Sequence, residues 1–333
     1  MSDSARRTGP KETPLDAISA TIALRDQRDL MQHPFFSLAK AKRVEPILYT
    51  AGDVEVQVHA LPDYGMATIW DADILIWAAS QLVEAADRGR PTSRFIRFTP
   101  HQLLIAIGRA AGQRQYQLLR RALQRLQSTV ILTTIRNGTN WRRQQFSWLN
   151  EWEDRLNGRG RSEGMEFVLP EWFFRGVVDR SLVLTIDPAY FKLTGGIERW
   201  LYRVARKHAG KQPDGWRFEL KHLHLKSGSQ ARFSDFALDV RRIVQRQSLP
   251  GYRLTIAKAR RSALLHIRPI DTKPPARPPV DNSVDQPQLP FGTSGAIRFG
   301  TSGAPNIESN EESNIVGGRR GFRRCGDPDG WRS

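Results

Sequence analysis

The segment KHLHLK, residues 221–226, comes closest in this sequence to a spacing that could do chemistry. His222 and His224 are separated by a single apolar residue. On a β-strand, side chains two positions apart lie on the same face. Two imidazoles placed in this way could hold a divalent ion that polarises a phosphate group. The sequence therefore raises the hypothesis of a metal-dependent nuclease.

Such a His-apolar-His clamp is typical of rolling-circle nickases, which also need a tyrosine nucleophile on a downstream helix. The helix predicted after the motif, residues 231–247, contains no tyrosine, while Tyr252 falls in a predicted strand and Tyr202 precedes the motif. If residues 220–226 are helical, the two imidazoles diverge by about 200° and cannot share a metal ion. The chain also lacks the GxxxxGK[ST] loop of an ATPase. We expect no enzyme activity, no metal and no cofactor, with nicking kept as an alternative.

The charge of the chain indicates an anionic partner. Its 333 residues carry a formal net charge of +17, which attracts nucleic acid, an anionic membrane surface or an acidic protein. The most apolar run, ADILIWAAS, is shorter than the ~18–20 residues of a membrane-spanning helix. The N-terminus has no apolar core of the secretory type, and a single cysteine, Cys325, excludes an internal disulfide. We expect a cytoplasmic protein with no membrane partner.

The positive charge is concentrated in two blocks. Residues 88–150 contain twelve arginines with no lysine and no acid, and residues 198–268 contain seventeen basic against five acidic residues. The segment from residue 271 onward is rich in Pro, Gly, Ser and Asn, repeats the octamer FGTSGAIR as FGTSGAPN, and balances eight basic with eight acidic residues. This composition predicts a disordered tail.

The first block predicts three helices followed by a β-hairpin. Residues 71–89 favour a buried helix, and the second helix begins with Thr99 as N-cap and Pro100 at its first position. The third helix, from residue 113, carries an apolar stripe that includes Leu119, Leu123 and Leu126. Two β-rich runs then flank Asn137-Gly138, a dipeptide that favours a tight hairpin turn. This order predicts a winged helix, whose third helix enters a DNA groove while the hairpin forms the wing.

The second block repeats this order. An amphipathic helix ends at Gly210, a short strand and a second helix follow in residues 216–226, and a third helix covers residues 231–247. The expected core stripe of this helix includes Phe233, Phe236, Val240 and Ile243. Residues 249–270 complete the copy as a hairpin. The predicted fold is thus α+β, with two tandem winged-helix domains and a disordered C-terminal tail.

The candidate DNA-binding residues are the polar side chains on the two third helices and at the two hairpin tips. In the first block they are Gln113, Arg114, Gln117, Arg121, Arg125, Arg136, Arg142 and Arg143. In the second block they are Arg232, Ser234, Asp235, Asp239, Arg242, Gln245, Arg246, Lys258, Arg260 and Arg261. Arginine and glutamine can read purine edges, and an aspartate can accept from cytosine or orient a neighbouring arginine. Asp239 and Arg242 also have the spacing of an ordinary helix ion pair.

Four strings resemble the replication initiator protein A family of alphaproteobacterial plasmids: HPFFSLAK, SLVLTIDPAYFKLTGGIERWLYRVARKHAG, SGSQARFSDFALDVRRIV and SLPGYRLTI. The resemblance covers most of residues 30–270 and leaves the tail outside. It implies an iteron-binding plasmid initiator in which the C-terminal winged helix reads direct repeats of the origin. It also implies further DNA contacts and homodimer formation by the N-terminal domain, repression of its own promoter, and cooperation with the host initiator and replicative helicase.

The expected organisation is a flexible N-terminal arm over residues 1–30, winged-helix domains over residues 31–160 and 161–270, and the tail over residues 271–333. The first block is as rich in arginine as the second, so its third helix is also expected to touch DNA. A transcriptional repressor without initiation activity remains an alternative, because tandem winged helices alone do not exclude it.

Overall fold

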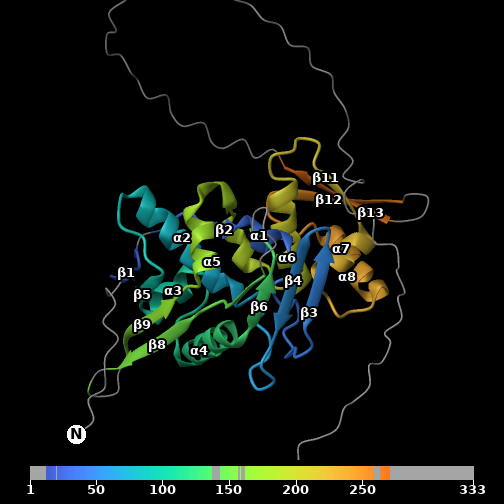
Figure 1. Cartoon of the computed structure of the whole chain (residues 1–333). Helices are drawn as coiled ribbons and strands as arrows, with labels where there is room; N and C mark the ends of the chain where they lie inside the picture. Colours follow the sequence, from blue (N-terminus) through green and yellow to red (C-terminus); the bar gives the residue numbers. More distant parts are fainter. Residues whose placement is uncertain are drawn as a thin grey trace, which may run out of the picture. The chain divides into compact units, whose positions relative to one another are not determined.

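Two sets of elements with the same order along the chain make up most of the fold (Figure 1). The computed structural model describes residues 13–19, 21–136, 143–156, 158, 162–258 and 263–270. All of them belong to the unit Met1–Pro274, one of two units into which the chain divides.

The first set, called the first module below, runs helix, strand, helix, helix, hairpin. It comprises α2 (Ala72–Asp87), β5 (Phe95–Phe98), α3 (Pro100–Ala106), α4 (Gln113–Ser128), β8 (Glu151–Leu156) and β9 (Ser162–Val168). Strand β9 lies between β5 and β8, and the short strand β1 (Leu15–Asp16) pairs in parallel with the outer edge of β5. The expected helix start at Thr99 is confirmed, since its hydroxyl accepts from the Gln102 N–H in a capping box.

The second module repeats this plan. It comprises α6 (Gly196–His208), β11 (Trp216–Glu219), α7 (Leu220–Ser227), α8 (Phe233–Arg246), β12 (Tyr252–Lys258) and β13 (Ala263–Pro269). Its sheet order is β11-β13-β12, which corresponds strand for strand to β5-β9-β8. Gln247 ends α8 at a positive φ of 49°, and its side chain bonds both the N–H and the carbonyl of Leu254, so the helix is tied to the first strand of the hairpin.

The hairpin expected to complete the first module belongs to another sheet. Strands β6 (Val130–Thr133) and β7 (Gln144–Ser147) do pair antiparallel on either side of the predicted turn. They join β3 (Ile47–Ala51) and β4 (Val54–His59) in the order β3-β4-β6-β7, because β6 pairs with β4 through partners such as Val58 and Ile131, both fully buried. The hairpin that pairs with β5 is β8–β9, further along the chain.

The segments outside the modules also hold strands and helices, and here the structure differs from the expected boundaries. They are β2 (Arg25–Gln27), α1 (Arg28–Gln32), α5 (Glu171–Val178), β10 (Val183–Thr185) and the 3-10 helices η1 (Arg180–Leu182) and η2 (Pro188–Lys192). Strand β2 pairs with β10, so residues assigned to a flexible arm form part of the fold, with Leu15, Leu24 and Leu30 buried. The boundary placed at residue 160 falls within the hairpin β8–β9.

Buried ion pairs connect the first helices of the two modules. The carboxylate of Asp73 on α2 lies 2.6 Å from Arg199 on α6 and 2.9 Å from Arg109. Arg203 on α6 forms two bonds, of 2.7 and 3.0 Å, with Asp26 on β2. Removing one member of such a buried pair leaves an uncompensated charge, which costs several kcal/mol. These contacts therefore fix α6 against α2 and β2.

Candidate nucleic-acid interface

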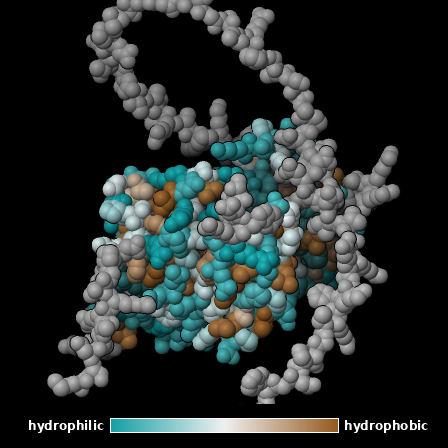
Figure 2. Space-filling model, viewed as in Figure 1, coloured by the Kyte–Doolittle hydropathy of each residue, from teal (hydrophilic) through white to brown (hydrophobic). Residues whose placement is uncertain are grey.

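Helix α4 presents an exposed polar face in the first module. Gln113, Arg114, Gln117 and Arg121 are all exposed, while Leu119, Ala122, Leu123 and Leu126 on the opposite side are buried. Among the described residues, Arg114 and Arg121 form no ion pair. Figure 2 shows hydrophilic residues, with separate apolar spots, over the face on which α4 lies in Figure 1. The predicted amphipathic pattern of this helix is confirmed.

Most arginines of the acid-free block, however, find carboxylates elsewhere in the chain. Eight of its twelve arginines form ion pairs with acids from outside the block, namely Arg88, Arg94, Arg97, Arg109, Arg120, Arg125, Arg136 and Arg143. The absence of acids within the block therefore does not mean that all of its charge is available to a partner. The cations that α4 leaves exposed and unpaired are Arg114 and Arg121.

Two predicted contact residues point into the protein. Arg125 forms two bonds of 2.8 and 2.7 Å with Asp71, and the hydrogen bond to this carboxylate raises the pKa of the guanidinium. Arg136 pairs with Asp29 at 2.5 Å, donates to the carbonyl of Trp172 and stacks over the Trp172 ring. Both were expected to face DNA. The structure instead places them against buried or partly buried carboxylates, whose charges they neutralise.

The remaining predicted residues of the first block lie near β7. Arg143, just before this strand, is exposed and lies 3.0 Å from Glu55 on β4. Arg142 lies outside the described residues. Because β7 belongs to the sheet β3-β4-β6-β7, Arg143 is carried by that sheet and not by the hairpin β8–β9.

Helix α8 presents the corresponding face in the second module. Ser234, Asp235, Arg242, Gln245 and Arg246 are exposed, Asp239 is partly exposed, and Arg232 is exposed at the N-cap. Phe236, Val240 and Ile243 form the buried stripe as predicted. Phe233, assigned to the same stripe, is 38% exposed; it is the first residue of α8, and its ring lies 5.8 Å from the His224 ring.

Ion pairs within the second module orient several of these side chains. Arg242 lies 3.2 Å from Asp239, the i,i+3 pair that the spacing allowed. Arg246 lies 3.1 Å from Glu198 on α6, and Ser248 donates to the same carboxylate. Lys258 is the last residue of β12 and pairs with Ala263 in the hairpin, while Arg260 and Arg261 lie outside the described residues.

An exposed leucine on each of the two helices was not predicted from the sequence. Leu118 is the sixth residue of α4 and Leu238 the sixth residue of α8, and they are 39% and 45% exposed. Each lies among polar neighbours on the exposed face of its helix, where an apolar side chain has no core to enter. The signal was an isolated leucine on the polar side of an amphipathic pattern. Apolar side chains at such positions can contact a thymine methyl group.

The histidines of the KHLHLK motif lie on α7, as the winged-helix order required. Two positions apart on a helix, their side chains diverge by about 200°. His224 bonds the carbonyl of Ala231 at 2.8 Å. Burial raises the pKa of Tyr202 and of Tyr252, which is the opposite of what activates a nucleophile. Across the described residues, no group of three His, Cys, Asp or Glu side chains is arranged to hold a metal ion.

No helix among the described residues is both long and apolar enough to cross a membrane.

Comparison with known proteins shows which proteins this chain resembles in fold and in sequence. The crystal structure of domains 2 and 3 of RctB, a selenomethionine derivative, superposes with a TM-score of 0.53 and 13% identity over 72% of this chain and 96% of that chain. A second crystal structure of RctB domains 2–3 gives a TM-score of 0.49 with 12% identity, over 73% of this chain and 96% of that chain. A Wigglesworthia glossinidia brevipalpis protein, described as a "Putative replication protein", is 33% identical over 228 residues, which are 67% of this chain and 82% of that protein. The fold is therefore shared with RctB domains 2 and 3, and the sequence is related to that of the Wigglesworthia protein.

The family follows from a second match. The model of "Replication initiator protein A" covers residues 25–254, which include the first module and the second module as far as the start of β12. The chain belongs to the replication initiator protein A family, and its general role is replication initiation.

Proposed function

We propose that this initiator binds double-stranded origin DNA through two winged helices, with α4 and α8 as recognition helices. The supporting observation is that the two modules share one plan. In each module a hairpin comes after the third helix, which has an exposed polar face, and the second strand of this hairpin lies between the first strand of the hairpin and the strand that precedes the second helix. In this proposal the wings are β8–β9 and β12–β13. The hairpin β6–β7 is an insertion, and Arg143 contacts the DNA backbone from a separate sheet.

The two recognition helices differ in the charges that they offer to DNA. On α4, Arg114 and Arg121 form no ion pair with any described residue and are available to phosphates, which supply salt-dependent affinity. On α8, Arg242 is held by Asp239 and Arg246 by Glu198, so each guanidinium enters the interface in a fixed direction. Restricted arginines suit the bidentate reading of guanine. We infer that α8 supplies most of the base specificity.

The proposed activity is binding without covalent chemistry. Several copies of the chain occupy direct repeats at a plasmid origin, distort the duplex, and allow the host replicative helicase to load. The same binding at its own promoter would repress transcription of the gene. In this proposal Leu118 and Leu238 contact thymine methyl groups. Arg125 and Arg136 stabilise the fold and do not contact DNA.

Footprinting on supercoiled DNA that surrounds the gene, combined with a reagent for unpaired bases, tests this proposal. Regularly spaced protection over direct repeats, with unpaired bases beside them, is the expected result. A single protected operator without melting would indicate a repressor. A strand break that requires a divalent metal would restore His222 and His224 as nuclease residues.

Two variants separate reading from backbone contact. Arg242→Ala should cost ~1–3 kcal/mol of binding free energy and relax specificity at one base pair. Arg143→Ala should weaken binding by a similar factor on every sequence, because a phosphate contact carries no sequence information. Competition binding against sites with single base changes measures both effects. A uniform loss for both variants would refute the assignment of Arg242 as a reader.

A further inference from the structure

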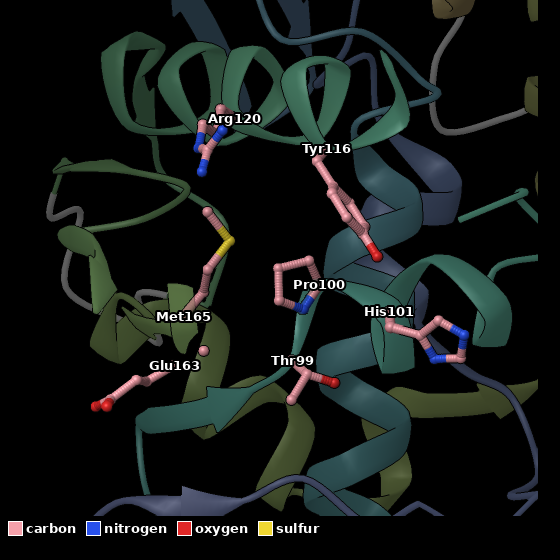
Figure 3. Close-up of a pocket in the computed structure, with 8 residues that line it drawn as sticks. Thr99, Pro100, His101, Tyr116, Arg120, Glu163 and Met165 are labelled. Carbon is pink, nitrogen blue, oxygen red and sulfur yellow. The ribbon is translucent and has the colours of Figure 1, made fainter. Parts of the chain in front are cut away.

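A pocket of about 270 Å³ opens beside the recognition helix of the first module. Its walls come from the start of α3, from α4 and from β9, and Figure 3 shows Pro100, Tyr116 and Met165 turned toward the same space. Sites that enclose a whole small molecule usually measure ~300–1,000 Å³. The pocket is therefore suited to one part of a larger molecule.

The walls of the pocket match a flat, mostly apolar group. The Tyr116 ring and the Pro100 ring offer stacking surfaces, and Met165 is a polarisable side chain that adapts to planar rings. Arg120, at the upper edge in Figure 3, is already bonded to Asp154, with a distance of 3.0 Å from its Nε. Its charge is thus compensated before any ligand enters.

A carboxylate at the rim argues against a phosphate as the occupant. Arg155 pairs with Gly164 and Leu156 with Ser162, so Glu163 is the extra residue of a β-bulge. Gly164 has a φ of +131°, and a Cβ there would lie 3.0 Å from the carbonyl oxygen of Phe98, so the backbone geometry of the bulge favours glycine. The bulge places an exposed acid at the mouth of the pocket in a strongly basic chain. Negative charge repels phosphate but can accept from the amino group of a base.

The position of the pocket indicates where such a base would come from. Tyr116 and Arg120 are one helical turn apart on α4, on the flank between its buried stripe and the exposed face of Gln113, Gln117 and Arg121. A strand that follows this face passes the mouth of the pocket. A base stacked within a duplex cannot enter, whereas an unpaired base can.

We propose that this pocket holds one unpaired base of a DNA strand that lies along α4. The first module then binds single-stranded DNA as well as duplex, which would retain a strand once the origin opens. This inference rests on the proposed function for its DNA strand, but it concerns a separate site that duplex recognition does not use.

The test compares the affinity of the chain for a DNA strand that carries bases with its affinity for a strand that has only the sugar-phosphate backbone. Two labelled single strands of about ten nucleotides, one of deoxycytidines and one abasic along its whole length, are titrated by fluorescence anisotropy. The wild-type chain should bind the base-containing strand more tightly. Tyr116→Ala should reduce that advantage by about 5- to 150-fold, the equivalent of the ~1–3 kcal/mol that one stacked base contributes. Tyr116→Phe keeps the aromatic ring, should retain the advantage, and is the matched control.

In the titrations, three results would overturn the proposal: equal affinity for the two strands, an advantage that survives Tyr116→Ala, or Tyr116-dependent binding of free dAMP without binding of the strand. Because Tyr116→Ala could also loosen the fold, the wild-type chain is crosslinked by ultraviolet light to a strand containing 5-iododeoxycytidine. An adduct on a pocket residue such as Tyr116 or His101 is expected, and adducts confined to other elements would overturn the proposal. Duplex binding is measured in parallel. If the wild-type chain does not bind duplex DNA, the proposed function is refuted. If it binds duplex DNA but shows no preference for the base-containing strand, only the proposal of a base-binding pocket is refuted.

Discussion

Arg114, Arg121 and Arg125 lie on the same helix, yet replacing them by alanine should produce different defects. Arg114 and Arg121 are exposed and form no ion pair within the described part of the chain. If both contact phosphates, each contact releases counterions and contributes ~0.9 to the slope of log K against log salt concentration. The double variant Arg114→Ala/Arg121→Ala should therefore lower the magnitude of this slope by ~1.8, with little change in the free energy of unfolding.

Arg125→Ala should instead destabilise the fold. Its side chain is 26% exposed, and it forms two bonds to Asp71, which is only 3% exposed. Breaking a fully buried pair costs ~3–5 kcal/mol. Asp71 keeps two further donors, the N–H and the hydroxyl of Thr68, at 2.8 and 3.0 Å. A lower cost of about 1–3 kcal/mol is therefore expected, closer to that of one unsatisfied buried group.

Two assays on the same preparations distinguish these defects. Urea unfolding at neutral pH gives the free energy of unfolding, and anisotropy on a duplex at several salt concentrations gives the slope. The reasoning is refuted if Arg125→Ala lowers the salt slope as much as Arg121→Ala does while leaving stability unchanged. A double variant with an unchanged slope would equally remove α4 from the interface.

Three further predictions concern stability and specificity. Asp73→Asn leaves Arg109 and Arg199 without their carboxylate, so urea unfolding should show a loss of about 3–5 kcal/mol; a loss below about 1 kcal/mol would contradict its role. Burial lowers the pKa of His33 to about 3 and that of His208 to about 2. Because the unfolded chain takes up these protons first, their contribution to stability is complete above about pH 6.5. It should fall below that pH by up to about 1.4 kcal/mol per unit for each histidine, and His33→Gln should flatten the decline. Leu238→Ala should lose affinity mainly at one A·T position in competition binding; an equal loss at all positions would count against a methyl contact.

Local signals in the sequence located the helices well, whereas strand pairing could not be read from them. Thr99 and Pro100 mark the start of α3 because capping involves only neighbouring residues. Asn137-Gly138 marks a hairpin equally well, but nothing in that segment says that its strand pairs with β4, which lies far earlier in the chain. A second Asn-Gly pair at residues 157–158 lies between β8 and β9. The hairpin predicted for the first module rests on the first of these two similar signals.

The same limit applies to the site. The exposed faces of α4 and α8 follow from helical periodicity, and the structure has them as predicted. The partners of individual arginines do not follow from it, because Asp71 and Asp29 lie far from Arg125 and Arg136 in sequence. A block without acids indicates a cationic surface only if the fold brings no acids to it. Here eight of the twelve arginines pair with acids from outside the block, and within the described residues two arginines of α4 form no ion pair.

Because two arginines of α4 form no ion pair with the described residues, the two modules are expected to contribute differently to DNA binding. In the proposed interface, the exposed arginines of α4 would add affinity for any backbone, while the paired arginines of α8 would lose less freedom on binding and favour a defined hydrogen-bond geometry. The contact of Asp73 with Arg199 joins the first helices of the two modules. If the proposal holds, DNA held by α4 would therefore be present at a raised local concentration near α8. Removing the charges of α4 should therefore weaken binding to specific and random duplexes by similar factors and leave their ratio nearly unchanged. Removing Asp239 should lower the ratio itself, because Arg242 would lose the partner that fixes its direction.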